Sequence, residues 1–428
     1  MEILGTIIQT IINMGAGVFL PIILTIVGLV FGMNFWKALK SGLLVGIGYT
    51  CLNLIVNLLI STIAPVTSFF ASSGEGYAII DAGWSTLAGA AWATPFAAII
   101  IPACLIINII LIKVHFTKTL NVDIWDYWHF MFTGAMAYYL LISNGVSIIT
   151  AYIVGLVITL TLSVIALYLG DKMGIAWRDF FGLEGTSAPH QAAQTTWLVA
   201  SLINKIIDII PGLNKIHLTM DTFTKKFSLV GDSTILGFII GCLLALFTGQ
   251  DITTILTTGV GIASSMVVMP KMVSLLLEGI TPIGKAAVSS LKKRMGEDVE
   301  IEMGMDVALG LGDPTTITAG VIMIPITVII ALIYPNNNFF PIGSLPALVY
   351  TTVMCSLATR GDLFRTLICA TVYMFYFMFA MNFLAIPATA VVAASGTYDL
   401  AGNMIVGTAL DALPNLIVGI VAKILGLF

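Results

Sequence analysis

Apolar runs of about 20 residues recur along the whole chain, and they limit the possible fold more than any other feature. Each run is long enough to cross a lipid bilayer as an α-helix. Of the 428 residues, 58% are hydrophobic and 9% are charged, whereas soluble domains carry roughly a quarter of charged residues. The sequence therefore predicts an all-α polytopic membrane protein.

We place about eleven membrane-crossing helices by hydropathy and length. Their approximate ranges are 10–32, 42–63, 86–112, 128–143, 146–169, 230–249, 253–274, 315–334, 341–358, 366–394 and 405–427. With the N-terminus outside and the C-terminus in the cytoplasm, all 18 Lys and Arg lie in inner loops or at inner helix ends. This agrees with the positive-inside rule, so we expect a multi-pass protein of the bacterial inner membrane in that orientation.

The two halves of the chain resemble each other. The segment "DAGWSTLAGAAWATP" (Asp81–Pro95) is similar to "GDPTTITAGVIMIP" (Gly312–Pro325). An odd number of helices in each half makes such a repeat inverted, an arrangement found in transporters that bind substrate at broken helices. We expect one domain, 1–428, with five-helix repeats over about 10–200 and 230–396, re-entrant segments, and an extra helix over about 405–427.

A dense polar stretch, "GLEGTSAPHQAAQTTW" (Gly182–Trp197), lies between apolar spans. Polar groups at membrane depth are costly and usually functional, and irregular backbone there lines protein or water. Glu184, His190 and Gln191 offer donors and acceptors for a polyhydroxylated ligand. We therefore predict a re-entrant binding segment, with an inert cytoplasmic loop as the alternative. Its counterpart in the second half is predicted in "NFLAIPATAVVAASG" (Asn382–Gly396).

Three other polar clusters are candidate site segments. His129 and Thr133 share one helix face because they are four residues apart. Asp313 follows a long loop and either caps the next helix or faces the substrate. Trp84 is either an interfacial belt residue or a ring that stacks on a sugar. The candidate substrate contacts are Trp84, Thr86, His129, Thr133, His190, Gln191, Asp313, Thr315 and Thr389.

Other features exclude several classes of protein. A net charge of −4 gives no indication of nucleic-acid binding, and the five scattered cysteines show no metal-binding or disulfide spacing. We expect no metal and no cofactor. The charged run "KKRMGEDVEIEMGMD" (Lys292–Asp306) is typical of a solvated cytoplasmic loop or a docking surface for a soluble partner.

Several motifs resemble one known family. The segments "NVDIWDYWHFMFTGAM" (Asn121–Met136), "FGLEGTSAPH" (Phe181–His190) and "GDLFRTL" (Gly361–Leu367) are the closest to its pattern. By these motifs the chain resembles the membrane component IIC of the galactitol branch of the phosphoenolpyruvate-dependent sugar phosphotransferase system (PTS), within the ascorbate–galactitol superfamily. The similarity extends over nearly the whole chain.

This resemblance implies a homodimer whose protomers have a scaffold and a core that moves as an elevator. A separate cytoplasmic IIB protein, recharged through IIA, would phosphorylate the sugar alcohol from a phosphocysteine. In ascorbate relatives the sugar contacts fall at or near Thr86, His129, Thr133, His190, Gln191, Asp313 and Thr315. The turn Gly312–Thr315 departs from the galactitol pattern, which leaves the identity of the sugar open.

Phosphoryl transfer requires an acceptor for the proton of the attacking hydroxyl. Glu184, His190 and Asp313 are the candidates for this catalytic role. The alternative is a proton- or sodium-coupled secondary transporter of a small polar solute, in which Asp313 or Glu184 would bind the ion. No protease motif and no repeated channel-filter residues are visible in the sequence.

Overall fold

The computed structural model describes residues 16–71, 77–121, 124–220, 233–295, 300–400 and 402–428. Most of these residues are helical, and the strands among them are two or three residues long. The helices are α2 (Ala16–Val30), α3 (Phe35–Ala71), α4 (Gly83–Trp92), α5 (Ala97–Lys113), α6 (Ile124–Ser143), α7 (Ile148–Phe181), α8 (Gln191–Ile209), η2 (Leu213–Lys215), α10 (Ser233–Phe247), α11 (Ile252–Met295), η3 (Val307–Gly312), α12 (Pro314–Ile333), η4 (Leu345–Ala347), α13 (Leu348–Thr359), α14 (Leu363–Ser395) and α15 (Leu413–Ile424). The strands are β1 (Ile79–Asp81), β2 (Thr119–Asn121), β3 (Thr186–Ser187), β4 (Glu302–Gly304) and β5 (Met404–Val406).

Several helices have the length and composition of membrane spans. In the described ranges, α7, α12, α14 and residues Ile252–Ala287 of α11 are long and apolar enough to cross a bilayer. Shorter apolar helices of 10–17 residues accompany them. The prediction of a mostly helical, polytopic membrane protein is therefore confirmed, while the number of eleven spans stays a prediction.

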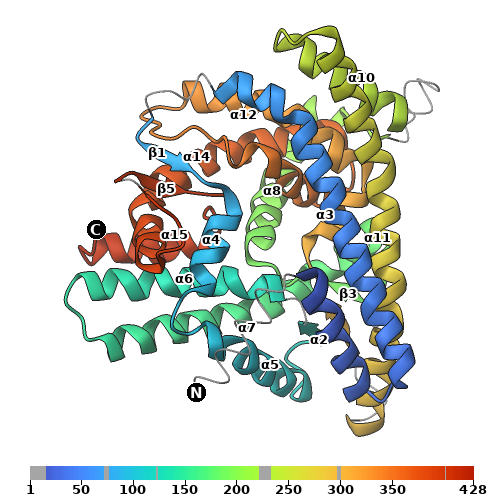
Figure 1. The fold of residues 1–428 in the computed structure, drawn as a ribbon, viewed down its shortest axis with the longest axis vertical. Coiled ribbons are helices and arrows are strands. Elements are labelled where there is room, and N and C mark those ends of the chain that lie inside the picture. Colours follow the sequence, from blue (N-terminus) through green and yellow to red (C-terminus); the bar gives the residue numbers. More distant parts are fainter. Residues whose placement is uncertain (1–15, 72–76, 122–123, 221–232, 296–299, 401) are drawn as a thin grey trace.

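The helices form two groups (Figure 1). The long helices α3 and α11 lie side by side, with α2 packed on α3 and α10 packed on α11. The second group contains α6, α7, α8, α12, α13, α14 and α15, which pack on one another. Elements of both halves of the chain contribute to each group.

Two small parallel sheets connect the halves. Strand β4 lies between β2 and β3 in one sheet, with Thr119 opposite Glu302 and Thr186 opposite Met303. Strand β1 pairs with β5 in the other, where Ile79 also forms a bridge with Phe339. In each sheet a strand from one half therefore pairs with two segments of the other half.

The structure differs from two expectations about helix continuity. The single span expected over 86–112 is divided into α4 and α5, because Pro95 cannot continue a helix and disfavours helical geometry at Thr94. The re-entrant segment expected over 382–396 is instead the continuous end of α14, which tolerates Pro387 in its interior.

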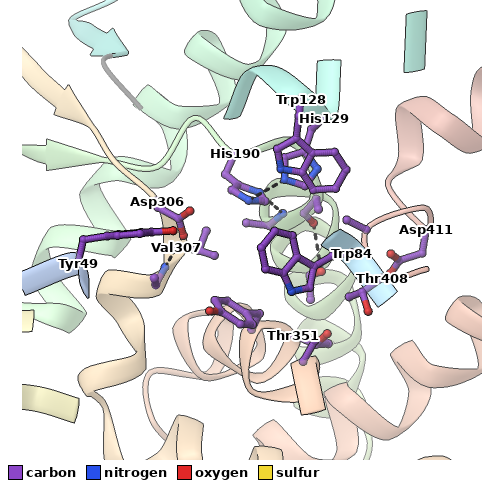
Figure 2. A pocket seen from close by; sticks show the side chains of 17 residues that line it. Tyr49, Trp84, Trp128, His129, His190, Asp306, Val307, Thr351, Thr408 and Asp411 are labelled. Carbon is purple, nitrogen blue, oxygen red and sulfur yellow. Dashed lines mark hydrogen bonds between the residues drawn. The ribbon is translucent and has the colours of Figure 1, made fainter. Parts of the chain in front are cut away.

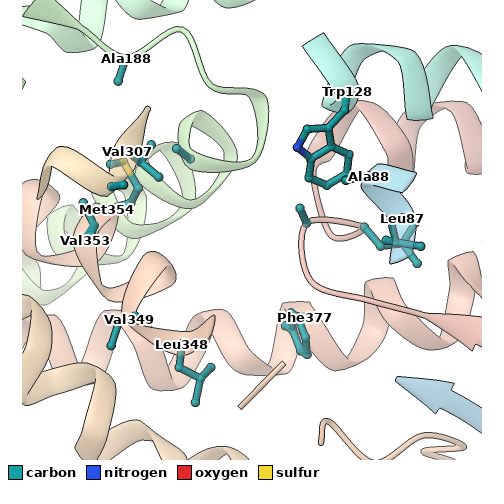
Figure 3. Close-up of a cluster of buried hydrophobic side chains, with 14 of the residues drawn as sticks. Leu87, Ala88, Trp128, Ala188, Val307, Leu348, Val349, Val353, Met354 and Phe377 are labelled. Carbon is teal, nitrogen blue, oxygen red and sulfur yellow. The ribbon is translucent and has the colours of Figure 1, made fainter. Parts of the chain in front are cut away.

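A buried apolar cluster joins these elements (Figure 3). It includes Leu87 of α4, Trp128 of α6, Val353 of α13 and Phe377 of α14, none more than 4% exposed. Val307 of η3 belongs to the same cluster. Because Trp128 and Val307 also line a polar cavity, core packing fixes part of its wall.

Close packing of α6 against α7 depends on a glycine. A Cβ atom at Gly134 would collide with the Thr159 hydroxyl and the Gly155 carbonyl of α7. We expect Gly134→Ala to lower the free energy of unfolding by about 1–3 kcal/mol, as overpacked cores do. Thermal unfolding of the purified protein in detergent checks this.

The matched control is Gly89→Ala in α4, where an added Cβ meets no atom within 4 Å. That variant should be neutral or up to about 1 kcal/mol more stable, because alanine is the better helix former. Equal melting temperatures for the two variants would contradict the packing argument.

Candidate functional site

The ends of the short strands bring polar residues from distant parts of the chain together. In the three-stranded sheet, β2 leads into the helix that carries His129, β3 leads to His190, and β4 leads to Asp306. In the other sheet, β1 precedes Trp84 and β5 precedes Asp411. Parallel strands end at the same edge of a sheet, so their following residues converge. All five residues line one cavity (Figure 2).

The cavity has a volume of about 120 Å³. Several water molecules or a small polar ligand fit this space, since one water needs roughly 10–15 Å³ by the same kind of measure. The rings of Tyr49, Trp84, Trp128 and Tyr350 provide much of its apolar wall, and hydroxyls of Thr351 and Thr408 add polar atoms. An aromatic wall with a few convergent polar groups is typical of small-ligand sites.

The two histidines form a buried pair. Their Nε2 atoms are 3.0 Å apart, and the His129 ring stacks on Trp128 with centroids 3.7 Å apart. His190 is the N-cap of α8, where its Nδ1 accepts the backbone N–H of Ala193 at 3.3 Å. Because Nδ1 is an acceptor, neutral His190 carries its proton on Nε2 and donates it to His129. The pair therefore requires a neutral His129 with an unprotonated Nε2.

The cavity wall is acidic in composition. Asp306 and Asp411 contribute carboxylates, and no Lys or Arg is among the described residues that line the cavity. In Figure 2 the two carboxylates lie on opposite sides of the cavity, with the histidines between them. Asp306 also accepts the backbone N–H of Ala308 at 2.7 Å as the N-cap of η3, which fixes its position. This wall suits a neutral ligand rich in hydroxyl donors.

A second layer of polar groups lies behind the cavity. Gln191 Nε2 donates to the Thr133 hydroxyl at 2.9 Å, and Thr133 donates to Asn415 Oδ1 at 2.5 Å. Asn415 Nδ2 in turn donates to the carbonyls of Ala409 and Leu410. The chain of bonds ties α6, α8 and α15 together. Thr133 and Gln191, both predicted as substrate contacts, thus lie next to the cavity wall without lining it.

The structure places three predicted residues in the cavity: Trp84, His129 and His190. It places Asp313 at the N-cap of α12, where the carboxylate accepts Thr316 N–H and the Ser356 hydroxyl at 2.9 and 2.8 Å. Of the two alternatives that the sequence left open for Asp313, the structure therefore shows the helix cap.

The four other predicted residues lie outside the cavity lining. Thr86 and Thr315 donate to the carbonyls of Ala82 and Gly361, respectively. Thr389 lies within α14 and accepts the backbone N–H of Ile405. Glu184 is exposed in the turn before β3.

Neither cavity carboxylate, Asp306 or Asp411, was predicted from the sequence as a site residue. Asp306 ends a segment that had been expected to be a solvated loop, but Ile301–Met305 are buried and contain β4. The alternation of Ile301, Met303 and Met305 with other residues is a strand signal, which the nearby charges obscured. Asp411 follows β5, and no local pattern indicates that this strand pairs with β1.

Comparison with known proteins identifies the family. Residues 10–411 match the family model EIIC-GAT, described as PTS system sugar-specific permease component. The PTS system galactitol-specific EIIC components of Escherichia coli K12 and O157:H7 are each 31% identical over 369 residues, 86% of this chain and 80% of theirs. A putative permease IIC component of Escherichia coli K12 is 30% identical over 395 residues, 92% of this chain and 88% of its own.

The match includes every described strand, every described helix except α15, and all the residues that line the cavity. It confirms the resemblance inferred from the motifs, and with the apolar helices it makes the chain a multi-pass membrane protein. The chain belongs to the EIIC-GAT family and is a PTS sugar-specific permease component.

Proposed function

We propose that the cavity binds a neutral sugar alcohol of the galactitol type and presents it for phosphorylation by a separate IIB protein. The observation that carries this proposal is the composition of the cavity wall, with two carboxylates, two imidazoles and no Lys or Arg among the described lining residues. Such a wall accepts hydroxyl protons and offers aromatic faces to C–H groups. The galactitol-specific relatives support the choice of polyol.

The orientation of the chain follows from its charges. Lys118 and Arg178 lie beside the β2–β4–β3 sheet, where they form ion pairs with Glu302. The segments around the β1–β5 sheet, 64–85 and 395–404, contain no Lys or Arg. By the positive-inside rule the first sheet faces the cytoplasm, the N-terminus lies outside and the C-terminus lies inside. IIB would then approach from the side of β4 and Asp306.

The sheet topology supports an inverted repeat. The order α2, α3, β1, α4, α5 of the first half is matched by α10, α11, β4, η3, α12 of the second. The remainder, β2–α6–α7–β3–α8, is matched by the segment around Phe339 with α13, α14, β5 and α15. Under this assignment α15 completes the second repeat and is not an extra helix. About eleven spans, with re-entrant segments at α4 and η3, remain our proposal.

The grouping of helices supports alternating access. The unit of α2, α3, α10 and α11 would be the dimer-forming scaffold, because these helices pack mainly with one another. The remaining elements carry most of the cavity wall and would move against this unit as an elevator. Both the homodimer and this movement belong to the proposal.

Phosphoryl transfer from IIB to the sugar needs a proton acceptor on the side of the cavity that IIB approaches. The attacking hydroxyl oxygen would form a bond to the phosphorus, the bond to the cysteine sulfur would break, and the hydroxyl proton would pass to a protein acceptor. Of the three predicted acceptors only His190 lines the cavity, and its Nδ1 would release the bond from Ala193 N–H to take the proton. Asp306 lies on the same side and is the second candidate. Glu184 and Asp313 remain proposals for a state in which they reach the ligand.

The test is phosphorylation of labelled galactitol by membranes that contain this chain and purified phospho-IIB, without an ion gradient. We expect sugar phosphate that depends on both proteins. Failure with every polyol, combined with gradient-driven uptake by the chain alone in liposomes, would replace this proposal with proton- or sodium-coupled transport. Product with a different polyol would correct the substrate and retain the reaction.

A further inference from the structure

Asp411 lines the cavity, but the phosphoryl-transfer step proposed above assigns it no role. The chain leaves β5 at Val406, passes along the cavity and enters α15 at Leu413. Asp411 lies in this connection, lines the cavity and is only 5% exposed. In Figure 2 it lies beside Thr408, on the side of the cavity away from Asp306. It is therefore remote from the expected approach of IIB.

Two tyrosines of α14 hold Asp411 in place. The Tyr373 hydroxyl donates to its carboxylate at 2.5 Å, and the Tyr376 hydroxyl donates to its backbone carbonyl at 2.5 Å. Short bonds from a neutral donor to a carboxylate are strong and directional. Tyr373 is 1% exposed, so this partner cannot turn away to solvent. The carboxylate thus has a fixed direction relative to the cavity.

The backbone next to Asp411 is also fixed. Ala409 has a φ of 77°, a conformation that costs energy for a residue with a side chain. Its carbonyl and that of Leu410 accept both bonds from Asn415 Nδ2, at 3.2 and 3.0 Å. Local strain that the surroundings maintain is common where a binding group must be preorganised.

No basic side chain compensates the charge of Asp411. In the described parts of the chain, the ion pairs between basic and acidic side chains all involve other residues. A buried carboxylate without a cationic partner is costly, so it is retained where a ligand supplies donors. A ligand hydroxyl is such a donor, whereas a ligand carboxylate would add a like charge in a poorly solvated cavity.

We propose that Asp411, oriented by Tyr373, accepts a hydroxyl at the end of the polyol remote from Asp306, and that it excludes sugar acids. Asp411 is then a specificity-determining residue that contacts the substrate. The inference rests on the proposed function and adds the means by which the site distinguishes a neutral polyol from the aldonic acid with the same carbon skeleton.

The experiment measures binding to the purified chain in detergent, without IIB. Labelled galactitol gives the dissociation constant, and competition by galactitol and galactonate gives the selectivity. We expect wild type to prefer the polyol by at least about 100-fold, and Asp411→Asn to bind galactitol about 10- to 100-fold more weakly, the effect of losing a hydrogen bond to a buried charge. The preference over galactonate should fall by at least about tenfold in the same variant.

Three further variants separate this role from a structural one. Asp179→Asn makes the same change at an exposed carboxylate and should leave the affinity for galactitol and the selectivity over galactonate unchanged. Tyr373→Phe keeps the charge, so we expect weaker galactitol binding with rejection of galactonate retained. Tyr376→Phe removes a bond to the same residue's backbone and should have the smaller effect on affinity. Melting temperatures confirm that each variant is folded.

The outcomes distinguish the inference from the proposed function. If Asp411→Asn has the affinity and selectivity of the wild type, Asp411 does not have the proposed role. Polyol binding by the chain would still be supported. If Asp411→Asn does not fold, unchanged affinity in folded Tyr373→Phe would overturn it. A wild-type chain that binds no polyol at all would overturn the proposed function and this inference together.

Discussion

Replacement of His190 by asparagine should weaken galactitol binding by about 10- to 100-fold. The variant removes an imidazole from the cavity wall and the bond that orients the His129 ring toward the ligand, and a lost hydrogen-bonding partner costs about 1–3 kcal/mol of binding free energy. Each 1.4 kcal/mol corresponds to about a tenfold change in affinity. Asparagine is a good N-cap residue, so the start of α8, where His190 Nδ1 accepts Ala193 N–H, is preserved. Equilibrium binding of labelled galactitol measures the effect.

His115→Asn is the matched control. His115 is exposed at a position with a φ of 58°, which asparagine also adopts readily, and it does not line the cavity. The His115→Asn variant should bind galactitol with the affinity of the wild type. Combining His190→Asn with His129→Gln should cost less than the sum of the single variants, with a coupling of about 0.5–3 kcal/mol, because the residues share one hydrogen bond. Additive losses, or an unchanged affinity in His190→Asn, would remove the histidine pair from the site.

His129 and His190 could be predicted as candidate residues from the sequence because both lie in or next to apolar segments expected in the membrane. A histidine in an apolar segment needs a partner, and this requirement is visible without any three-dimensional information. Trp84 was found in the same way, from its position in a polar turn between spans. That the two histidines are partners of each other could not be predicted, because they are 61 residues apart and meet only through the packing of α6 and α8.

Asp313 shows where residue type alone is insufficient. An aspartate before Pro-Thr-Thr is equally consistent with a helix cap and with a ligand contact. In the structure its carboxylate is occupied by Thr316 and Ser356, and the latter comes from α13. Asp306, seven residues earlier, lines the cavity instead. The difference depends on β4, whose pairing with two strands of the first half has no local sequence signal.

The helices were easier to predict than the connections between them. Hydropathy located α7, α12 and α14 because each contains a long apolar window. The short strands were missed, since two or three residues are too few for a clear periodic pattern and the alternation around β4 is obscured by nearby charges. Yet these strands join the halves and carry the site residues at their ends. The repeat was proposed from sequence letters, whereas the pairing of β1 with β5 joins segments more than 300 residues apart and leaves no local pattern.

Replacement of Arg178 by alanine should lower the free energy of unfolding by about 3 kcal/mol. Arg178 pairs with Glu302 of β4, the central strand of the three-stranded sheet, and Glu302 is only 7% exposed. Loss of one partner leaves a buried charge uncompensated, which costs about 3–5 kcal/mol. We expect the lower end of this energy range because the Arg178 side chain is 19% exposed and Lys118 stays 3.8 Å from the Glu302 carboxylate. Thermal unfolding in detergent measures the loss.

Lys118→Ala removes the other basic partner of Glu302 and is the control. Lys118 also pairs with Glu300 at 2.8 Å, but Glu300 is exposed and Lys118 is only partly buried, so we expect a loss below about 1 kcal/mol. Arg178→Met with Glu302→Leu should recover most of the stability, because an apolar pair of similar volume carries no desolvation cost. An Arg178→Ala protein as stable as wild type would contradict the buried ion pair.

The pH dependence of the Arg178→Ala defect tests its electrostatic origin. Burial is the largest influence on Glu302 and raises its pKa above the ordinary value, while Arg178 and Lys118 act in the opposite direction. A raised carboxyl pKa means that the folded state binds the proton more tightly than the unfolded chain, so stability falls as pH rises through that pKa. Without Arg178 the pKa rises further, so the defect should be largest at about pH 8 and small below about pH 3.5, where the carboxyl is mostly protonated in both states. A defect of constant size across this range would instead mean that Arg178 stabilises the sheet through the packing of its aliphatic chain, as Arg side chains also do.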